Sequence, residues 1–329
     1  MRGYAWRGRS YAEFGHSIGF LTTLAEAREG FMSLTRKQFD VLEAIASSGK
    51  SSTQRGLEKI TGYSLGTINK VMKELNEAGY VENSAITDAG ISALEPYRAK
   101  RAIFIAAGFG TRLVPITFNT PKPLVRVHGV RIIDRLNDAC LAAGIEEIYI
   151  VRGYLGELFD QLLYKYPMVK FLENPLYNEA NNISSSLVAR YMLSNAYVFE
   201  ADLLISNPSI IRKYHYTSDF LAIKKERSDD WCFRVKDGII VEEKVGGEGD
   251  NIWQMVGISY WNEEDGHKLS QDIADVYNAP GGKERYWEQV PLVYRKEHYR
   301  VEVRECRDED IVEIDTFNEL KAIDKTYDV

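Results

Sequence analysis

Cysteine is scarce and scattered in this sequence. The three cysteines, Cys140, Cys232 and Cys306, are far apart and form no Cys-x-x-Cys pair. An odd, dispersed set of this kind supports neither a disulfide framework nor a zinc site built from paired thiolates. Free cysteines are typical of a reducing compartment, and we therefore expect a cytoplasmic protein.

Long apolar runs and an excess of positive charge are missing as well. No stretch is long and apolar enough to cross a bilayer, so we expect no membrane partner. The 329 residues carry a net charge of −7, which excludes an overall basic field that would attract nucleic acid or anionic lipid. An anionic ligand would have to be held by a local cluster of basic residues. The length, with 45% apolar and 27% charged residues, is typical of a globular protein of two domains.

The N-terminal part of the chain has helical periodicity after an irregular start. Residues 1–31 show little pattern, and we expect them to form a disordered extension. Residues 32–98 then give three helices, a short hairpin and a half-helix, at 35–48, 53–60, 64–78, 79–90 and 91–97. This order resembles a winged helix-turn-helix domain.

The charge of this domain bears on its role. Eight Lys and Arg residues between positions 32 and 98 are matched by eight Asp and Glu residues. A domain that reads DNA usually has a basic face, so we rank DNA binding below a docking or regulatory role. The residues that would face DNA on the third helix are Ser64, Thr67, Asn69, Lys70 and Lys73.

Strand and helix patterns alternate beyond a junction at 96–101. Strands are expected at 101–107, 146–153, 168–174 and 196–202, with helices between them at 130–144, 154–166 and 182–195. This order predicts a three-layer, Rossmann-like α/β domain over residues 99–329, with a mixed, mainly parallel sheet. From about residue 219 the pattern becomes β-rich, with helices expected near 263–277, 284–294 and 317–327 and strands at 300–306 and 310–315.

A glycine-rich loop, AAGFGTRLVPITFNTPKPL at residues 106–124, follows the first strand of this domain. Gly108 and Gly110 therefore lie at the edge of the sheet where ligands bind in open α/β folds. Glycine lets backbone N–H groups approach phosphate oxygens without a Cβ in the way. Arg112 and Lys122 add a planar and a compact cation, so the loop favours an anionic, phosphate-bearing ligand.

Two common phosphate-binding loops are excluded by the spacing. This loop has no Gly-Lys-Ser/Thr, which the Walker pattern requires, and Leu113 stands where the dinucleotide fingerprint needs a third glycine. A bare Gly-x-Gly could be a structural turn. The longer string GxGTRxxPxT, followed by PKPL, is far more specific.

That string, over residues 108–129, resembles the signature of the sugar-phosphate nucleotidyltransferase superfamily. Its members join a nucleoside triphosphate to a phosphorylated substrate and release pyrophosphate. Five further segments are similar to bacterial CTP:phosphocholine cytidylyltransferases, namely 174–208, 229–235, 256–266, 284–292 and 312–324. The resemblance covers residues 100–329 and implies that CTP and phosphocholine are the substrates, CDP-choline and pyrophosphate the products, and Mg²⁺ the cofactor.

Two aspartates end predicted strands of this domain. Asp202 ends AYVFEAD and Asp315 ends DIVEID, and the resemblance places the metal on this pair. Hard carboxylate oxygens are what Mg²⁺ prefers. Asp315 could instead cap the following helix. Glu313, two residues before Asp315, would face the same side and approach the substrate amine.

The expected reaction gives the two basic residues of the nucleotide site a role. Arg112 would hold the β- and γ-phosphates and Lys122 the α-phosphate, so that both are catalytic together with Asp202 and Asp315. The residues expected to bind the nucleotide are Ala106, Ala107, Gly108, Gly110, Thr111, Arg112, Lys122, Asn182, Ser184 and Ser185. Asn182 could equally well only cap the helix that it begins.

The acceptor pocket is expected to combine aromatic faces with acids. A trimethylammonium group is held by aromatic rings and a carboxylate, and Trp231, Tyr286, Trp287 and Glu288 offer both, with Glu313 nearby. Because 12% of the residues are aromatic, some of these rings could simply belong to the core. A primary amine such as 2-aminoethylphosphonate would rely more on the carboxylates, and both acceptors stay open.

A function of another class is a transcription regulator whose larger domain only senses a ligand. The complete set of Arg112, Lys122, Asp202 and Asp315 argues against a domain that has lost its catalysis.

Overall fold

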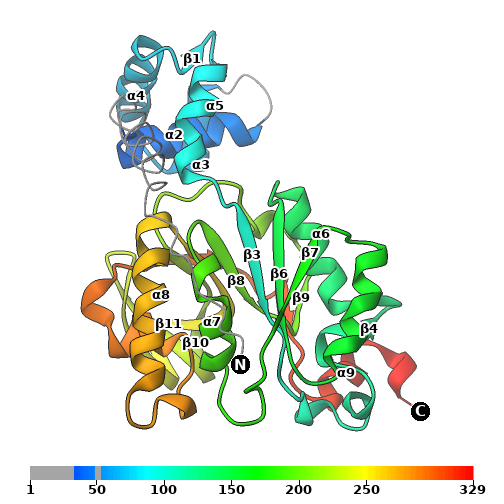
Figure 1. The fold of residues 1–329 in the computed structure, drawn as a ribbon. Helices are drawn as coiled ribbons and strands as arrows, with labels where there is room; N and C mark the ends of the chain where they lie inside the picture. The colour runs from blue at the N-terminus through cyan, green and yellow to red at the C-terminus, as the bar shows by residue number, and fades with distance from the viewer. Residues whose placement is uncertain (1–32, 49–52, 329) are drawn as a thin grey trace, which may run out of the picture. The chain divides into compact units, whose positions relative to one another are not determined.

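The computed structural model describes residues 33–48 and 53–328, so the extension expected at 1–31 lies outside the described residues. The chain divides into two compact units, Met1–Pro96 and Tyr97–Val329 (Figure 1). In the part that is described, no helix combines the length and the apolar character needed to cross a membrane.

The smaller unit is the expected winged helix. It contains α2 (Arg36–Ser48), α3 (Gln54–Thr61), α4 (Leu65–Glu77), a hairpin of β1 (Val81–Glu82) and β2 (Ala85–Ile86), and α5 (Asp88–Leu94). The 3-10 turn η1 (Glu95–Tyr97) follows at the boundary between the units. The side chains of Thr53, Ser64 and Thr87 cap α3, α4 and α5 by accepting a backbone N–H from the first turn. Gly62, with a φ of 72°, ends α3 in the left-handed conformation that glycine adopts without strain. Local capping chemistry thus fixes where these helices begin and end.

The larger unit is built on a seven-stranded mixed sheet. Its strands lie in the order β10 (Asp219–Lys236), β12 (Glu302–Cys306), β11 (Ile239–Trp261), β8 (Ala196–Glu200), β3 (Arg101–Ile105), β6 (Glu147–Arg152) and β7 (Val169–Glu173). The four strands from β8 to β7 are parallel, and β11 runs antiparallel to β8. This confirms the predicted Rossmann-like fold with a mainly parallel sheet.

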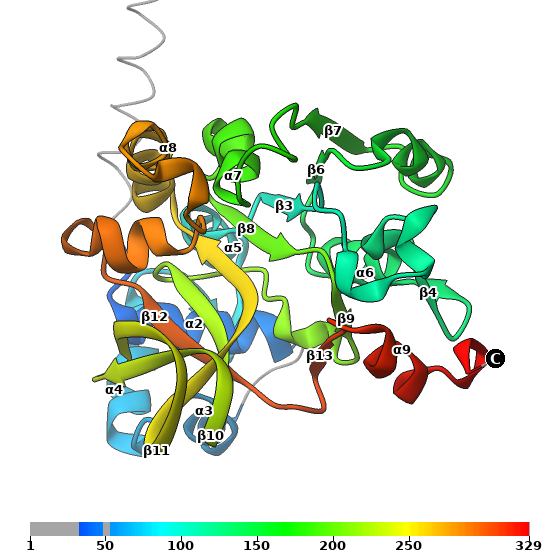
Figure 2. The ribbon, with the colours of Figure 1, turned by 90° about the horizontal axis from the view of Figure 1, so that it is seen from below.

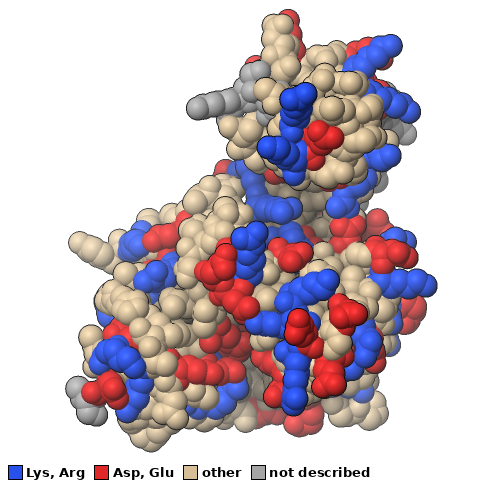
Figure 3. Space-filling view, turned by 180° about the vertical axis from the view of Figure 1, so that it is seen from behind, with Lys and Arg blue, Asp and Glu red and all other residues tan. Residues whose placement is uncertain are grey.

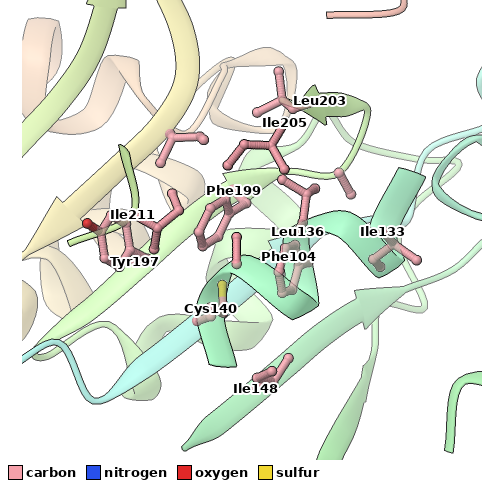
Figure 4. Close-up of a cluster of buried hydrophobic side chains, with 14 of the residues drawn as sticks. Phe104, Ile133, Leu136, Cys140, Ile148, Tyr197, Phe199, Leu203, Ile205 and Ile211 are labelled. Carbon is pink, nitrogen blue, oxygen red and sulfur yellow. The ribbon is translucent and has the colours of Figure 1, made fainter. Parts of the chain in front are cut away.

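Two layers of helices cover the sheet (Figure 1). Alternate residues of the central strands point to opposite faces, so that Phe104 of β3 joins the core under α6 (Ile132–Ala142) and Ile103 joins the core under α7 (Ile183–Ala189) and α8 (Glu263–Asn278). Phe104 stacks on Phe199 of β8 with 4.8 Å between ring centroids, beside Leu136 and Cys140 of α6 (Figure 4). Each fully buried ring contributes roughly 1.5–3 kcal/mol of hydrophobic stabilisation.

Three expected helices take other forms. Segment 154–166 is a 3-10 helix, η5 (Gly156–Tyr164), and segment 182–195 is α7 followed by the 3-10 turn η6 (Arg190–Met192). The helix expected at 284–294 divides into the turn η8 (Gly282–Glu284) and the π-helical turn η9 (Val290–Tyr294). Pro291 has no N–H to donate, so a regular helix cannot run through this segment.

A small ribbon at the carboxyl end of the central strands brings distant residues together. Strand β9 (Leu203–Ile205) follows Asp202 and pairs antiparallel with β13 (Ile311–Glu313), as Figure 2 shows. Glu313 is thereby the register partner of Leu203, and the N–H of Ile314 donates to the carbonyl of Asp202 at 3.3 Å. The ribbon therefore sets Asp202 beside the residues that follow β13.

The larger unit also contains several short elements. They are the hairpin of β4 (Arg126–Val127) and β5 (Val130–Arg131), the helix α9 (Phe317–Ile323), and the 3-10 turns η2 (Thr111–Leu113), η3 (Ile116–Phe118), η4 (Lys122–Leu124), η7 (Pro208–Ile210), η10 (Lys296–His298) and η11 (Lys325–Tyr327). A small apolar cluster that includes Leu113, Leu204, Ile314 and Leu320 packs the glycine-rich loop, the ribbon and α9 together.

Candidate active site

A cavity of about 280 Å³ opens where the glycine-rich loop leaves β3. Eight of its lining residues were predicted from the sequence as nucleotide, catalytic or metal residues, namely Ala106, Gly108, Gly110, Thr111, Arg112, Lys122, Asp202 and Asp315. Ile105, Pro123 and Ala201 complete the wall. Ala107, which was also predicted, is not part of the lining; it is buried, and its carbonyl accepts the N–H of Tyr154 at 3.1 Å.

The two glycines of the loop, Gly108 and Gly110, have different surroundings. A Cβ at Gly108 would meet nothing within 4 Å, so the backbone there faces open space. Gly110 has a φ of 62°, and a Cβ there would lie 3.1 Å from side-chain carbons of both Lys122 and Thr117. The loop is thus open at Gly108 for a ligand and closed at Gly110 around the Lys122 side chain.

Cations and carboxylates meet in the cavity. Lys122 Nζ lies 2.6 Å from Asp202 Oδ2 and 3.1 Å from Asp315 Oδ1. Arg112 donates to both oxygens of Asp315, at 2.8 and 2.6 Å. Burial by itself would lower the pKa of Lys122, but the two carboxylates outweigh it and the pKa is raised. Lys122 is therefore charged at neutral pH, and it lies where an incoming anion can reach it.

An acidic cluster lies next to Lys122. One carboxylate oxygen each from Glu200, Asp202 and Glu313 lies within 4.8 Å of the other two. Asp202 Oδ1 is buried and has no hydrogen-bond partner among the described residues. Burial, together with Asp202 and neighbouring acids, raises the pKa of Glu200 well above its ordinary value and that of Glu313 to about 9. Clustered oxygen ligands with an orphaned buried oxygen fit a hard divalent cation.

Asp315 is not the cap of α9. Thr316 caps this helix, and Glu319 completes a capping box with it. Glu319 Oε2 accepts the N–H groups of Asp315, at 2.8 Å, and of Thr316, at 2.7 Å. Because its neighbours satisfy the helix terminus, the Asp315 side chain is left to bind Arg112 and Lys122.

The residues predicted at the start of α7 lie outside this cavity. The hydroxyls of Ser184 and Ser185 are buried and accept from Asn174 Nδ2, at 2.9 and 3.0 Å. Asn182 does not cap α7 with its side chain; its Oδ1 instead accepts the N–H of Trp287 at 2.9 Å. Their contact with the nucleotide stays a prediction, and the bonds that they make here are internal.

The residues predicted for the acceptor pocket divide into core and surface. Trp287 is only 3% exposed and packs against Phe220 and Trp261, so it presents no open ring face. Tyr286 is 38% exposed, and its ring lies 5.6 Å from that of Trp231, edge to face. These two rings, and not Trp287, are the aromatic surface available to a ligand.

Comparisons with known proteins agree with this geometry. The family model for nucleotidyl transferases matches residues 101–226, and that for the MarR family matches residues 32–88. The 2-aminoethylphosphonate cytidylyltransferase of Lancefieldella rimae is 36% identical over 230 residues, 69% of this chain and 92% of that protein. The choline-phosphate cytidylyltransferase of Streptococcus pneumoniae is 30% identical over 231 residues, 68% of this chain and 97% of that protein. The chain belongs to the nucleotidyl transferase family, in its cytidylyltransferase group.

A solved structure leads to the same group. CTP:phosphocholine cytidylyltransferase from Streptococcus pneumoniae superimposes with a TM-score of 0.64 at 28% identity, over 70% of this chain and 99% of that one. The chain is thus a nucleotidyltransferase that carries a MarR-type winged helix before its catalytic unit.

The sequence did not reveal every acid of this cytidylyltransferase. Glu200 stands two residues before Asp202, and the period of a strand places both on the same side, so this spacing was an available signal. Glu243, in the long strand β11, also has a buried carboxylate. It stands in a run of acids, VEEKVGGEGD, in which nothing distinguishes it.

Proposed function

We propose that this cytidylyltransferase transfers CMP from CTP to a phosphate or phosphonate oxygen of a small amine, with release of pyrophosphate. The proposal rests on one observation: the cavity beside the glycine-rich loop is lined by Arg112, Lys122, Asp202 and Asp315, whose charged groups contact one another. Phosphocholine and 2-aminoethylphosphonate are the two candidate acceptors, because each is named as the substrate of a relative that is at least 30% identical to this chain.

Binding of the triphosphate relies on the loop. The open backbone at Gly108 leaves N–H groups free to approach phosphate oxygens, and Arg112 offers a planar pair of donors to the β- and γ-phosphates. Lys122 would neutralise charge that grows around the α-phosphorus during the reaction. Both cations are paired with carboxylates in this structure, so they would exchange those partners for phosphate.

Glu200, Asp202 and Glu313 would hold the divalent cation, for which Mg²⁺ is our candidate, and Asp315 would join them once Arg112 and Lys122 turn to phosphate. The cation would supply charge neutralisation for the triphosphate. The acceptor oxygen attacks the α-phosphorus, and the bond from that phosphorus to the bridging oxygen of pyrophosphate breaks. No general base is required, because a phosphate or phosphonate is already anionic near neutral pH.

A panel of acceptors tests the proposal. The full-length protein is incubated with CTP, Mg²⁺ and either phosphocholine, 2-aminoethylphosphonate or phosphoethanolamine, and pyrophosphate is measured. We expect release with at least one of them and none with glucose 1-phosphate. Replacement of CTP by ATP, GTP or UTP should lower the rate strongly. Absence of pyrophosphate with every amine acceptor would overturn the proposal.

A second candidate function is DNA binding by the smaller unit, which its match to the MarR family favours. The cations of its helix α4 are paired within that helix, Lys70 with Glu74 at 4.0 Å and Lys73 with Glu77 at 3.7 Å. Both signs of charge are also mixed over the face seen in Figure 3. DNA affinity depends on cations that are free for phosphate, so we place this function second. A gel-shift assay with genomic fragments tests it.

A further inference from the structure

Strand β11 brings one more carboxylate to the acceptor side of the proposed active site. Glu243 is the register partner of Phe233 in β10, so the two side chains lie on the same face of the hairpin. Trp231 stands two residues before Phe233 and shares that face, and its ring contacts the ring of Tyr286. Glu243 therefore belongs to the wall that faces the segment containing Tyr286 and Glu288.

The carboxylate of Glu243 has no partner. Both of its oxygens are buried and accept no hydrogen bond from any described residue. Glu288, which is 3% exposed, accepts from Asn182 Nδ2 at the long distance of 3.4 Å. Across the described ranges, neither glutamate forms an ion pair with a Lys, Arg or His. Burial raises the pKa of Glu243 to about 8, with a further contribution from Glu288, and burial raises the pKa of Glu288 to about 7.

Asp219, a structural carboxylate in the same unit, differs from these two glutamates in its hydrogen bonds. Asp219 is buried as well, but it accepts from Arg304 at 2.9 Å and from His215 at 2.7 Å. Buried acids are normally satisfied in this way, because an unpaired one costs free energy. Among the described residues, Glu243 has no donor at all and Glu288 has no charged one, which points to a ligand that brings a charged donor.

We propose that Glu243 and Glu288 together bind the ammonium group of the acceptor and select a primary ammonium over a trimethylammonium group. This inference rests on the proposed function and narrows its acceptor to an ω-amino phosphonate or an ω-amino phosphate. A primary ammonium has three N–H donors for the unpaired oxygens, whereas a trimethylammonium group has none. Trp231 and Tyr286 would then cover the carbon chain of the acceptor.

The pocket joins the reaction centre through Glu200. Glu200 is near enough to both Asp202 and Glu288 for each of them to raise its pKa, so the proposed metal site and the ammonium site are neighbours. Its carboxylate also fills the space over Gly257, where a Cβ would come within 2.8 Å of Glu200 Oε2. Only a short acceptor, with few carbons between its phosphorus and its nitrogen, fits between sites linked by one side chain.

An N-methylation series tests the selectivity. Phosphoethanolamine and its mono-, di- and trimethyl derivatives keep the same charge on nitrogen while each methyl group replaces one N–H donor, and the last of the series is phosphocholine. At saturating CTP, we expect kcat/KM to fall with each methyl group, by at least about tenfold over the series, because each step leaves a buried oxygen unpaired. Values that stay level or rise toward phosphocholine would overturn the inference.

Two neighbouring substitutions separate a specific role of Glu243 from a structural one. Glu243→Gln keeps the shape but removes the charge, so the KM for phosphoethanolamine should rise about tenfold, with the KM for CTP unchanged. Glu242→Gln is the matched control, because Glu242 points to the other face and pairs with Arg234 at 3.2 Å. It should leave both constants unchanged. If Glu243→Gln raised the KM for CTP and the KM for every acceptor by the same factor, the role of Glu243 would be structural and the inference would be overturned.

One measurement needs only the unmodified protein. Ethylammonium should compete with phosphoethanolamine for the pocket, and tetramethylammonium should compete much more weakly. The opposite order would overturn the selectivity even if the Glu243 variant did not fold. If the wild-type protein releases no pyrophosphate with any acceptor of the series, the proposed function itself fails, which is distinguishable from a change in preference.

Discussion

Lys122 Nζ lies 2.6 Å from Asp202 Oδ2, so a cation expected to face CTP and a carboxylate expected to hold the metal are bound to one another. Asp315 accepts a second hydrogen bond from the same ammonium group, at 3.1 Å. The site thus neutralises itself in the ligand-free protein. Binding of a metal–nucleotide complex would then exchange one set of ion pairs for another, so that the cations and the aspartates have charged partners both before and after binding.

This exchange predicts two opposite effects of the substitution Lys122→Met. Turnover should fall by about 100-fold or more, because the charge facing the α-phosphate is lost. Affinity for a divalent cation without nucleotide should increase, because Asp202 and Asp315 no longer have a competing ammonium group. Pyrophosphate release measures the first effect and titration with Mn²⁺ measures the second. Weaker Mn²⁺ binding in this variant would contradict the account.

The substitution Asp202→Ala should abolish turnover. It removes a carboxylate that both belongs to the acidic cluster and contacts Lys122. Asp275→Ala is a suitable control, since Asp275 is exposed on α8 and accepts from Gln271 in the same helix. Near-normal pyrophosphate release by the Asp202 variant would exclude the metal site proposed here.

Local sequence was sufficient for the parts of the site that are made by local chemistry. Gly108, Arg112 and Lys122 act within one loop, and their spacing is itself the signal. Asp202 could be found because the predicted strand 196–202 ended with it, although β8 itself ends two residues earlier, at Glu200. The alternation of strands and helices likewise predicted the layers of the larger unit.

Other features depend on contacts between distant segments. Glu200 and Glu313 become neighbours only because β9 pairs with β13, about a hundred residues further along the chain. Trp287 and Tyr286 are adjacent in sequence, yet only packing against Phe220 decides that the first is core and the second is surface. No periodicity of a short segment carries this information.

A buried network gives a prediction on pH and stability. Burial tends to raise the pKa of Asp219, but Arg304 and His215 outweigh it and hold the pKa at about 2, below its ordinary value of 3.8. The charged form is therefore favoured in the folded state. The ionised Asp219 carboxylate therefore stabilises the folded state above pH 4, and this stabilisation is lost as the pH falls toward 2. The shift corresponds to about 2 kcal/mol at neutral pH.

Urea unfolding of the Asp219→Asn variant measures the contribution of the Asp219 charge to stability. Its free energy of unfolding should be lower than that of the wild type by at least about 2 kcal/mol at pH 7, and the difference should shrink below pH 4. Asp308→Asn serves as a control, because Asp308 is an exposed residue paired with Lys225, and such pairs contribute little. A difference that is constant between pH 7 and pH 3 would contradict the role of the Asp219 charge.

The catalytic unit should function without the winged helix. Every residue assigned to the nucleotide, metal and acceptor sites lies between Ala106 and Asp315, within the compact unit Tyr97–Val329. A chain that begins at Tyr97 should therefore keep kcat/KM for CTP within about threefold of the full-length value, as expected for domains that fold on their own. A loss of activity with a normal thermal unfolding transition would show instead that the smaller unit contributes to catalysis.

The capping box of α9 should affect catalysis through Asp315. Glu319 Oε2 accepts the N–H groups of both Asp315 and Thr316, so it fixes the backbone from which the Asp315 side chain reaches Arg112. Glu319→Ala should cost about 1 kcal/mol of stability and also lower kcat, because Asp315 loses its fixed position. Glu319→Gln retains an acceptor oxygen and should restore most of the activity. If Glu319→Ala lowered stability but left kcat and the KM for CTP unchanged, the capping box would serve the helix alone, and the position of Asp315 would have to be set by its ion pairs with Arg112 and Lys122.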